Sequence, residues 1–199
     1  MANSEVDTGR RRFLIGATSV VGAAGTVAMA VPFLSSWNPS ARALAAGAPV
    51  EVNISKIENG QQIREIWRGK PVWIVKRTEE MLKNLPLNDP KLRDPASDVV
   101  SQQPEYAKNG TRSRKPEYLI LVGICTHLGC SPTYRPELAP EDLGVDWKGG
   151  WYCPCHGSRY DLAGRVFKGV PAPINLAVPP HYYKSDGVIV VGEDGEAVS

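Results

Sequence analysis

The chain has 199 residues, with 23 Lys and Arg against 21 Asp and Glu, for a formal net charge of +2. A chain of this length can bury one ordinary hydrophobic core, and its nearly balanced, scattered charge argues against a nucleic-acid partner. The 19 Gly and 17 Pro residues lie mostly in the C-terminal two thirds, which favours short strands joined by tight turns.

The first predicted element is a membrane-spanning helix. Residues 13–40 carry no charge, and the most apolar part of this stretch, 13–37, would extend about 38 Å as a helix, enough to cross a hydrocarbon core of about 30 Å. The arginines at 10–12 precede it and, by the positive-inside rule, keep the N-terminus in the cytoplasm. We therefore predict a cytoplasmic N-terminus at 1–12, a single-pass transmembrane anchor at 13–40, and the remaining chain on the outer, periplasmic side. A buried core helix is the alternative, but too few apolar elements follow to surround it.

The anchor is preceded by a possible export signal. The run TGRRRFLIG resembles a twin-arginine signal, because Arg10 and Arg11 are followed after one residue by Phe13 and Leu14. This route exports folded proteins that already carry their cofactors. Small residues in ARALAAGA could be cut by a signal peptidase. The uncharged stretch is longer than the apolar part of a typical signal, however, and its apolar part ends at Trp37, a residue suited to the membrane interface, so we predict that the anchor stays uncleaved.

A linker follows the anchor. Residues 41–49 are dominated by Ala and Gly and offer no apolar face. We predict that they form a flexible linker, or hinge, between the anchor and one soluble domain at 50–199. A passive tether is the alternative that this composition leaves open.

The soluble domain begins with strand patterns. PVEVNI alternates as a strand does, and QQIREIWRGKPVWIVKR is typical of a hairpin that turns at 68–71. TEEMLKNL predicts a short helix with Thr78 as its N-cap and Pro86 beyond its end. The polar, turn-rich residues 87–116 predict a long surface excursion with little regular structure.

The later elements are strands as well. EYLILVGI predicts a buried strand that runs directly into the first cysteine motif, and YKSDGVIVV predicts a closing hairpin around Asp186 and Gly187. The chain is therefore expected to be mainly antiparallel β with a little helix.

Two short motifs hold all four cysteines and two of the three histidines. CTHLGC and CPCHGS are separated by residues 131–152 and contain Cys125, His127, Cys130, Cys153, Cys155 and His156. Each motif offers one cysteine two or three residues ahead of a histidine, and each has one cysteine to spare. The simplest account assigns two thiolates and two imidazoles to a metal centre and joins the spare cysteines in a disulfide.

Three kinds of site compete for these residues. A Cys2His2 zinc site, as in a structural zinc-binding module, could use the same four ligands but leaves the spare cysteine pair unexplained. A domain stabilised only by disulfides needs no histidines, so this alternative leaves the two histidines in the motifs unexplained. A [2Fe-2S] cluster with two Cys on one iron and two His on the other, the Rieske arrangement, accounts for every one of these residues.

At this level of detail a family resemblance is specific. CTHLGC together with CPCHGSRYD resembles the Rieske iron–sulfur subunit of ubiquinol–cytochrome c reductase, the cytochrome bc complex, in its bacterial form. The resemblance implies a Rieske-type antiparallel β domain with an inserted cluster-binding subdomain at about 120–180, and one [2Fe-2S] cluster. It implies that the inner iron is bound by Cys125 and Cys153, the outer iron by His127 and His156, and that the disulfide joins Cys130 and Cys155.

The resemblance also assigns roles to neighbouring residues. Ser158 and Tyr160 would donate hydrogen bonds to a bridging sulfide and to a ligand sulfur, which raises the reduction potential. Leu128 and Gly129 would line the docking tip. Pro171, in KGVPAPINL, would belong to the proline loop that covers the cluster.

Two features depart from the family pattern. Val170 stands where the family more often has Gly, and the segment at 131–152 looks longer than in mitochondrial members. Both put the local shape of the docking surface in question, but not the ligation. His181 follows two prolines and is predicted to be an ordinary surface residue.

The function implied by the resemblance is electron transfer in the respiratory chain of the cell inner membrane. The chain would act as a catalytic subunit of quinol–cytochrome c reductase: it would take an electron and a coupled proton from quinol through His127 or His156, and pass the electron to a membrane-bound c-type cytochrome. Cytochrome b and that cytochrome would be its partners, in a dimeric complex. The alternative is the Rieske small subunit of a periplasmic arsenite oxidase; a Rieske dioxygenase component fits less well, because the chain has no room for a second iron domain.

Overall fold

The structure, a computed structural model, describes residues 7–195, which divide into two compact units at Ala45 and Ala46. The first unit contains helix α1 (Thr8–Ser35), whose N-cap Asp7 accepts hydrogen bonds from the backbone N–H groups of Gly9 and Arg10. Among the described residues, α1 alone is long and apolar enough to cross a membrane. It begins before the stretch predicted as the anchor and ends before that stretch does, and residues 1–6 of the predicted cytoplasmic segment lie outside the described part. Helix α2 (Ala41–Ala46) occupies most of the predicted linker.

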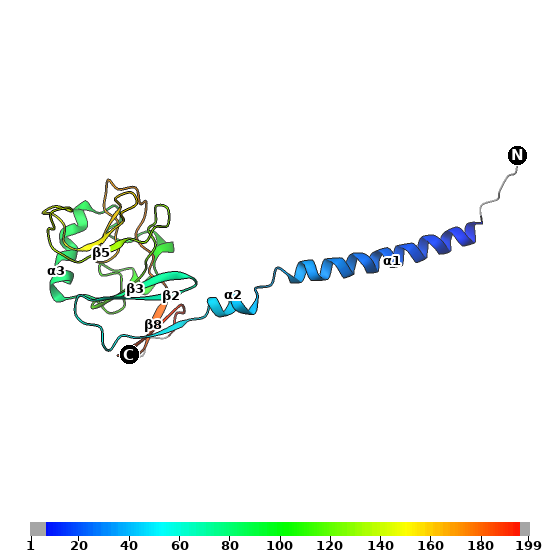
Figure 1. Cartoon of the computed structure of the whole chain (residues 1–199), viewed down its shortest axis with the longest axis horizontal. Helices are drawn as coiled ribbons and strands as arrows, with labels where there is room; N and C mark the ends of the chain where they lie inside the picture. Colours follow the sequence, from blue (N-terminus) through cyan, green and yellow to red (C-terminus); the bar gives the residue numbers. More distant parts are fainter. Residues whose placement is uncertain (1–6, 196–199) are drawn as a thin grey trace. The chain divides into compact units, whose positions relative to one another are not determined.

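The second unit is a β domain of three antiparallel sheets (Figure 1). The first sheet has the order β1-β9-β8, the second β2-β3-β4 and the third β5-β6-β7. The strands are β1 (Val50–Asn53), β2 (Gln62–Trp67), β3 (Lys70–Lys76), β4 (Tyr118–Val122), β5 (Thr133–Arg135), β6 (Gly150–Tyr152), β7 (Arg159–Asp161), β8 (His181–Ser185) and β9 (Val188–Val191). The helical elements of this unit are α3 (Glu79–Asn88) and the short 3-10 helices η1 (Asp89–Lys91), η2 (Val100–Gln102) and η3 (Glu105–Ala107).

The middle sheet is buried on both faces, which explains its unbroken apolar runs. Successive side chains of a strand point to opposite faces. In β3, Val72 and Ile74 belong to the hydrophobic core shared with β1, β8 and β9, whereas Trp73 and Val75 belong to the core shared with the cysteine motifs. The sheet β2-β3-β4 therefore lies between the other two (Figure 1), and it forms the support for the third sheet. The predicted mainly antiparallel β fold with an N-terminal apolar helix is confirmed.

Both predicted hairpins are present. Strands β2 and β3 pair from Trp67 and Lys70 outward around a two-residue loop. Both loop residues, Arg68 and Gly69, have positive φ angles of 51° and 70°, as a type I′ turn requires. The closing hairpin turns at Asp186 and Gly187, between β8 and β9.

The predicted end of the short helix was wrong. Thr78 is its N-cap, since Thr78 Oγ1 accepts a hydrogen bond from the Met81 N–H at 3.2 Å. Pro86, however, lies inside α3, which continues to Asn88. The Pro86 ring removes one backbone N–H donor but does not end the helix. The reason is that the buried residues Leu85 and Asn88 pack the last turn of α3 against the domain.

The segment 87–116 has little regular structure and many exposed residues, as predicted, but several of its side chains are buried and pack it against the domain. Its regular structure is limited to the end of α3 and the three 3-10 helices, but Arg112 is fully buried. The Arg112 guanidinium donates to the carbonyl oxygens of Ala163 and Gln102 at 3.1 and 3.3 Å. Arg77 is also buried, and its guanidinium donates hydrogen bonds to the carbonyl oxygens of Thr111 and Leu162 at 2.9 and 3.0 Å. Burial lowers the pKa of each guanidinium to about 10, so both remain charged at neutral pH, and their hydrogen bonds attach the segment to the part of the domain that carries the second cysteine motif.

His181 is not a surface residue. It is 0% exposed in β8. Its Nδ1 lies 2.9 Å from the Pro179 carbonyl oxygen, and its Nε2 has no hydrogen-bond partner among the described residues. Burial lowers the pKa of His181 to about 4, and nearby Arg114 adds to this effect. The prediction failed because the two prolines direct the chain into a strand whose His181 and Tyr183 face inward.

We expect His181 to make the domain less stable in mild acid. The unfolded chain binds a proton near pH 6.5 and the folded chain only near pH 4, so the contribution to the free energy of unfolding is complete above pH 6.5 and is lost as the pH falls toward 4. Between pH 7 and pH 5 the loss is about 2 kcal/mol. Urea unfolding at both pH values should show this loss in the wild type and not in His181→Phe; an equal loss in both would contradict the assignment.

Candidate metal centre

The two cysteine motifs fold into loops with the same backbone hydrogen bonds. In the first, the Cys125 N–H donates to the Cys130 carbonyl at 2.7 Å and the Gly129 N–H donates to the Cys125 carbonyl at 3.0 Å. In the second, Cys153 and Ser158 make the matching bond at 2.8 Å, and the Gly157 N–H donates to Cys153 at 2.9 Å.

A glycine at the same place in each loop makes this shape possible. Gly129 and Gly157 have φ angles of 87° and 76°, a conformation that favours glycine. Strand β4 leads into the first loop, and strands β6 and β7 flank the second.

A disulfide holds the two loops together. Cys130 and Cys155 are bonded, as predicted, and they are 25 positions apart in sequence. The sulfurs of Cys130, Cys155 and Cys153 lie within 4.8 Å of one another. Because the first two are bonded to each other, neither can act as a thiolate ligand. The free cysteines, Cys125 and Cys153, are therefore the available sulfur donors.

Removing this disulfide should destabilise the domain. The double variant Cys130→Ser, Cys155→Ser frees a loop of about 25 residues in the unfolded chain, which corresponds to about 3.5 kcal/mol in the chain-entropy account. Denaturant unfolding of the domain measures the difference, with Ser131→Ala, an exposed neighbour, as the control. An unchanged unfolding midpoint in the double variant would show that the bond adds nothing to stability.

The two free thiols are buried side by side under the loops. Cys125 is 3% exposed and Cys153 is 2% exposed. Burial raises the pKa of Cys125, but hydrogen bonds from Tyr160, the His127 backbone and Cys153 outweigh it, so that the pKa is lowered overall. Burial raises the pKa of Cys153, and repulsion from Cys125 adds to this. Two adjacent thiolates repel each other when no cation is nearby. A bound metal cation offsets this repulsion, so both thiols can then ionise.

The two motif histidines lie together at the surface. The rings of His127 and His156 have centroids 4.8 Å apart and are nearly perpendicular, at 87°. His127 is partly exposed and His156 is exposed. The four donors thus form two pairs of different chemistry, with sulfur inside and nitrogen outside. Leu128, 72% exposed, and Gly129 stand next to the imidazoles at the loop tip.

A hydroxyl network surrounds the Cys125 sulfur. The Tyr160 hydroxyl lies 3.2 Å from Cys125 Sγ, and it accepts a hydrogen bond from the Thr126 backbone N–H at 3.1 Å. Thr126 Oγ1 donates to the Ile174 carbonyl at 2.7 Å and lies 3.1 Å from the Tyr160 hydroxyl, so the phenol can donate its proton to the Cys125 sulfur or to Thr126 Oγ1. Burial and the neighbouring Cys125 raise the pKa of Tyr160, which keeps the phenol protonated. No role was predicted for Thr126; its place between a cysteine and a histidine was the available signal.

The proline loop is fastened to both motifs. The Ala172 N–H donates to Ser158 Oγ at 3.1 Å, and the bond from Thr126 to Ile174 ties the other end. Pro171 is exposed at the start of this loop and Ala172 is fully buried. The Ser158 hydroxyl proton remains free to point toward the space between the loops.

Comparisons with known proteins agree with this geometry. The family of the Rieske [2Fe-2S] domain matches residues 97–180, and the ubiquinol–cytochrome c reductase Fe-S subunit TAT signal matches residues 1–40. The ubiquinol–cytochrome c reductase iron-sulfur subunit of Allochromatium vinosum is 64% identical over 194 residues, which cover 98% of this chain and 93% of the relative. The chain belongs to the family of ubiquinol–cytochrome c reductase iron–sulfur subunits.

Other relatives extend the comparison. The subunit of the same name from Blastochloris viridis is 42% identical, covering 96% of this chain and 98% of the relative. Among solved structures, a chain of a hyperthermophilic respiratory complex III is 26% identical, with a TM-score of 0.48, and the match covers 89% of this chain and 98% of that one.

Membership of this family confirms several predictions. The chain is a membrane-anchored electron-transfer component of the cytochrome bc complex, an oxidoreductase, and its cofactor is one Rieske-type [2Fe-2S] cluster. The twin-arginine signal prediction is confirmed as well. The arsenite oxidase and zinc alternatives are not supported. The residues present fit the cluster, because two buried thiols and two surface imidazoles are the mixed donor set that it requires.

Proposed function

We propose that Cys125 and Cys153 bind the inner iron of the cluster and that His127 and His156 bind the outer iron, so that this chain is a catalytic subunit of quinol oxidation. The observation that carries the proposal is the separation of the donors into a buried sulfur pair and a surface nitrogen pair. Two imidazoles in place of two thiolates remove two negative charges from the donor set, which favours a high reduction potential. When bound, the cluster accepts one electron and passes it on.

The exposed imidazoles are placed to handle the proton. A quinol hydroxyl can donate a hydrogen bond to whichever of His127 and His156 faces it, and that imidazole then holds the proton. Leu128 offers an apolar contact beside them for the quinol pocket of cytochrome b. The buried cysteines and the covering proline loop keep water away from the sulfur side.

Tyr160→Phe tests the hydroxyl network. The hydroxyl lies 3.2 Å from Cys125 Sγ, and its hydrogen bond stabilises the more negative, reduced state. Loss of about 1 kcal/mol of such stabilisation corresponds to a potential lower by roughly 40 mV for one electron. A redox titration followed by EPR measures the shift. Tyr152→Phe, on the neighbouring strand, is the control, and equal potentials in all three proteins would contradict the proposal.

We place the chain in an inner membrane, with α1 as an uncleaved anchor and the β domain on the periplasmic side. Support comes from the apolar helix α1, the arginines at its N-terminal end and the export signal. The partners that this implies are cytochrome b and the membrane-bound c-type cytochrome, in a dimeric complex. The domain would move between them about the linker at 41–49. Prolines introduced into that linker should slow cytochrome c reduction at an unchanged cluster potential; unaltered turnover would refute this movement.

The whole proposal is tested on the purified complex. EPR of the ascorbate-reduced complex should give the signal of a cluster with mixed nitrogen and sulfur ligation, and metal analysis should find iron and acid-labile sulfide without zinc. Added quinol should reduce that cluster and, in turn, a c-type cytochrome. A signal of all-cysteine ligation, or a cluster that quinol does not reduce, would overturn the proposal.

A further inference from the structure

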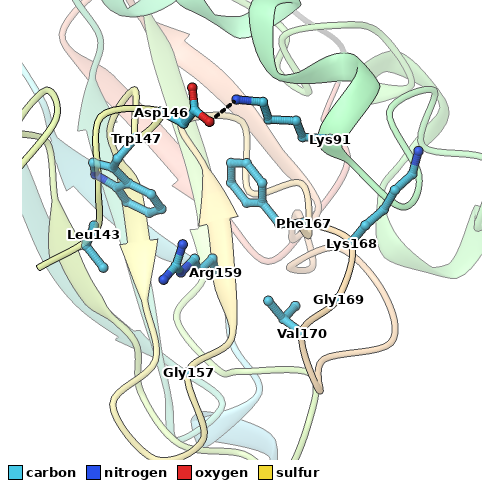
Figure 2. A pocket seen from close by; sticks show the side chains of 10 residues that line it. All are labelled: Lys91, Leu143, Asp146, Trp147, Gly157, Arg159, Phe167, Lys168, Gly169 and Val170. Carbon is cyan, nitrogen blue, oxygen red and sulfur yellow. Dashed lines mark ion pairs between the residues drawn. The ribbon is translucent and has the colours of Figure 1, made fainter.

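A groove of about 540 Å³ lies beside the second cysteine motif (Figure 2). Ten residues line it, and those that define its chemistry are Trp147, Phe167, Lys91, Asp146, Arg159 and Lys168. They come from the long segment before β6, from β7 and the residues that follow it, and from η1. None of them takes part in the proposed cluster ligation or in the hydroxyl network.

The groove has an excess of positive charge. Three cations and one carboxylate line it, which leaves a formal net charge of +2. Lys91 Nζ is paired with Asp146 at 3.0 Å, and Lys168 Nζ donates to the Pro90 carbonyl at 3.0 Å. The Arg159 guanidinium has no hydrogen bond or ion pair with any described residue, although it is half-buried. A half-buried guanidinium without an anion favours binding one, and its planar fork matches a carboxylate.

Aromatic rings form the walls. The rings of Trp147 and Phe167 have centroids 6.0 Å apart at an angle of 27°, and Figure 2 shows Arg159 projecting into the same groove. Trp147 is held in place because its Nε1 donates to the Arg135 carbonyl at 3.0 Å. Arg135 in turn makes a bidentate pair with Asp142, at 2.7 and 2.8 Å. The wall is therefore formed in advance, which lowers the entropy cost of binding.

The groove is continuous with the electron-transfer tip. Gly157, which lines it, directly follows His156, and Val170, which also lines it, directly precedes Pro171. The residue and the segment that depart from the family pattern, Val170 and 131–152, thus both contribute to this groove. Whatever enters it also contacts the edge of the surface that must dock on a partner protein.

We propose that the groove binds an acidic polypeptide segment of a partner subunit of the same complex, with a carboxylate on Arg159 and an adjoining apolar side chain between Trp147 and Val170. This inference rests on the proposed function for the identity of the complex. The aromatic walls suit a carboxylate that carries an aliphatic stem, and continuity with the docking tip favours a protein occupant over a lipid headgroup. The contact orients the head on its partner.

Zero-length carbodiimide cross-linking of the purified complex tests the proposal, because the reagent joins a lysine to a carboxylate in contact with it. Peptide mass spectrometry should find Lys168 or Lys91 joined to an Asp or Glu of another subunit. High salt should weaken the link. Arg159→Gln should reduce its yield about tenfold, which corresponds to about 1.4 kcal/mol, while Arg159→Lys retains most of it. Arg64→Gln removes a positive charge that is exposed and lies outside the groove, and it should leave the yield unchanged.

The outcomes separate this inference from the proposed function. If these lysines link only within their own chain, or if Arg159→Gln leaves the yield unchanged, the groove holds no acidic segment. If the groove lysines form no link to a peptide of another subunit, and their modification depends on added anionic phospholipid, the groove binds a lipid headgroup. That result also overturns the inference. In each case the EPR signal and quinol reduction would be retained. If Arg159→Gln disturbs the cluster, Phe167→Ala, which removes one wall, replaces it with the same expected loss.

Discussion

His156→Asn in the full-length chain is expected to reduce the iron and acid-labile sulfide content to less than about a tenth of the wild-type value. His156 is one of the two surface imidazoles, with its ring centroid 4.8 Å from that of His127. An asparagine amide is a poor donor for iron, so the outer iron would lose one of its two protein ligands and the centre would not persist. Metal analysis and the EPR spectrum of the reduced protein measure the loss.

The matched control for this variant is Leu128→Ala. Leu128 is 72% exposed at the tip of the first motif and offers no donor atom, so its replacement should leave cluster content unchanged while weakening quinol oxidation. A cluster of unchanged content and unchanged spectrum in His156→Asn would refute the ligand assignment. Loss of the cluster in both variants would indicate a general disturbance of the loops.

Gly150→Ala is expected to lower the free energy of unfolding of the β domain by at least about 3 kcal/mol. Gly150 has a φ angle of 150°, and a Cβ added there would lie 1.9 Å from the Tyr160 carbonyl oxygen and 3.0 Å from the Asp161 Cα. Because these are backbone atoms, β6 and β7 must move apart. Strand β7 carries Tyr160, so the hydroxyl beside Cys125 would move as well.

Gly144→Ala separates the strain of the backbone angle from the clash. Gly144 also has a positive φ angle, 88°, but a Cβ there would meet nothing within 4 Å, so we expect a loss of only about 1 kcal/mol. Denaturant unfolding of both variants gives the comparison. Equal losses would mean that β6 and β7 can separate at no cost, which would contradict the tight packing of this sheet.

The features that could be predicted from the sequence are those with local causes. The β2–β3 hairpin needs only two residues that adopt positive φ between alternating strands, and Arg68 and Gly69 supply them. The Thr78 cap is satisfied by a backbone group three residues away. The disulfide and the cluster chemistry followed from residue types and their spacing, because few cofactors use two thiols and two imidazoles together.

The errors share a different origin. Pro86 is tolerated inside α3, His181 is buried, and part of the polar segment 87–116 is buried, all because of contacts with parts of the chain that are distant in sequence. Arg112 illustrates the point: its polarity suggested the surface, but its two terminal nitrogens donate to the carbonyl oxygens of residues 163 and 102 in the interior. A buried charge is tolerated only where hydrogen-bond acceptors surround it. The sequence does not show which carbonyl oxygens will lie next to a given arginine.

The sequence alone thus predicted the apolar N-terminal helix, the export signal, the strand pattern and two short motifs with the candidate donors of the cluster, since each of these patterns depends on neighbours within a few residues. Only the tertiary structure decided that sulfur lies inside and nitrogen outside, that Thr126 and Tyr160 meet at the Cys125 sulfur, and that Arg159 faces a groove without a partner. The physical reason is that burial and pairing depend on which distant segments pack together, and that choice is made by the whole core at once.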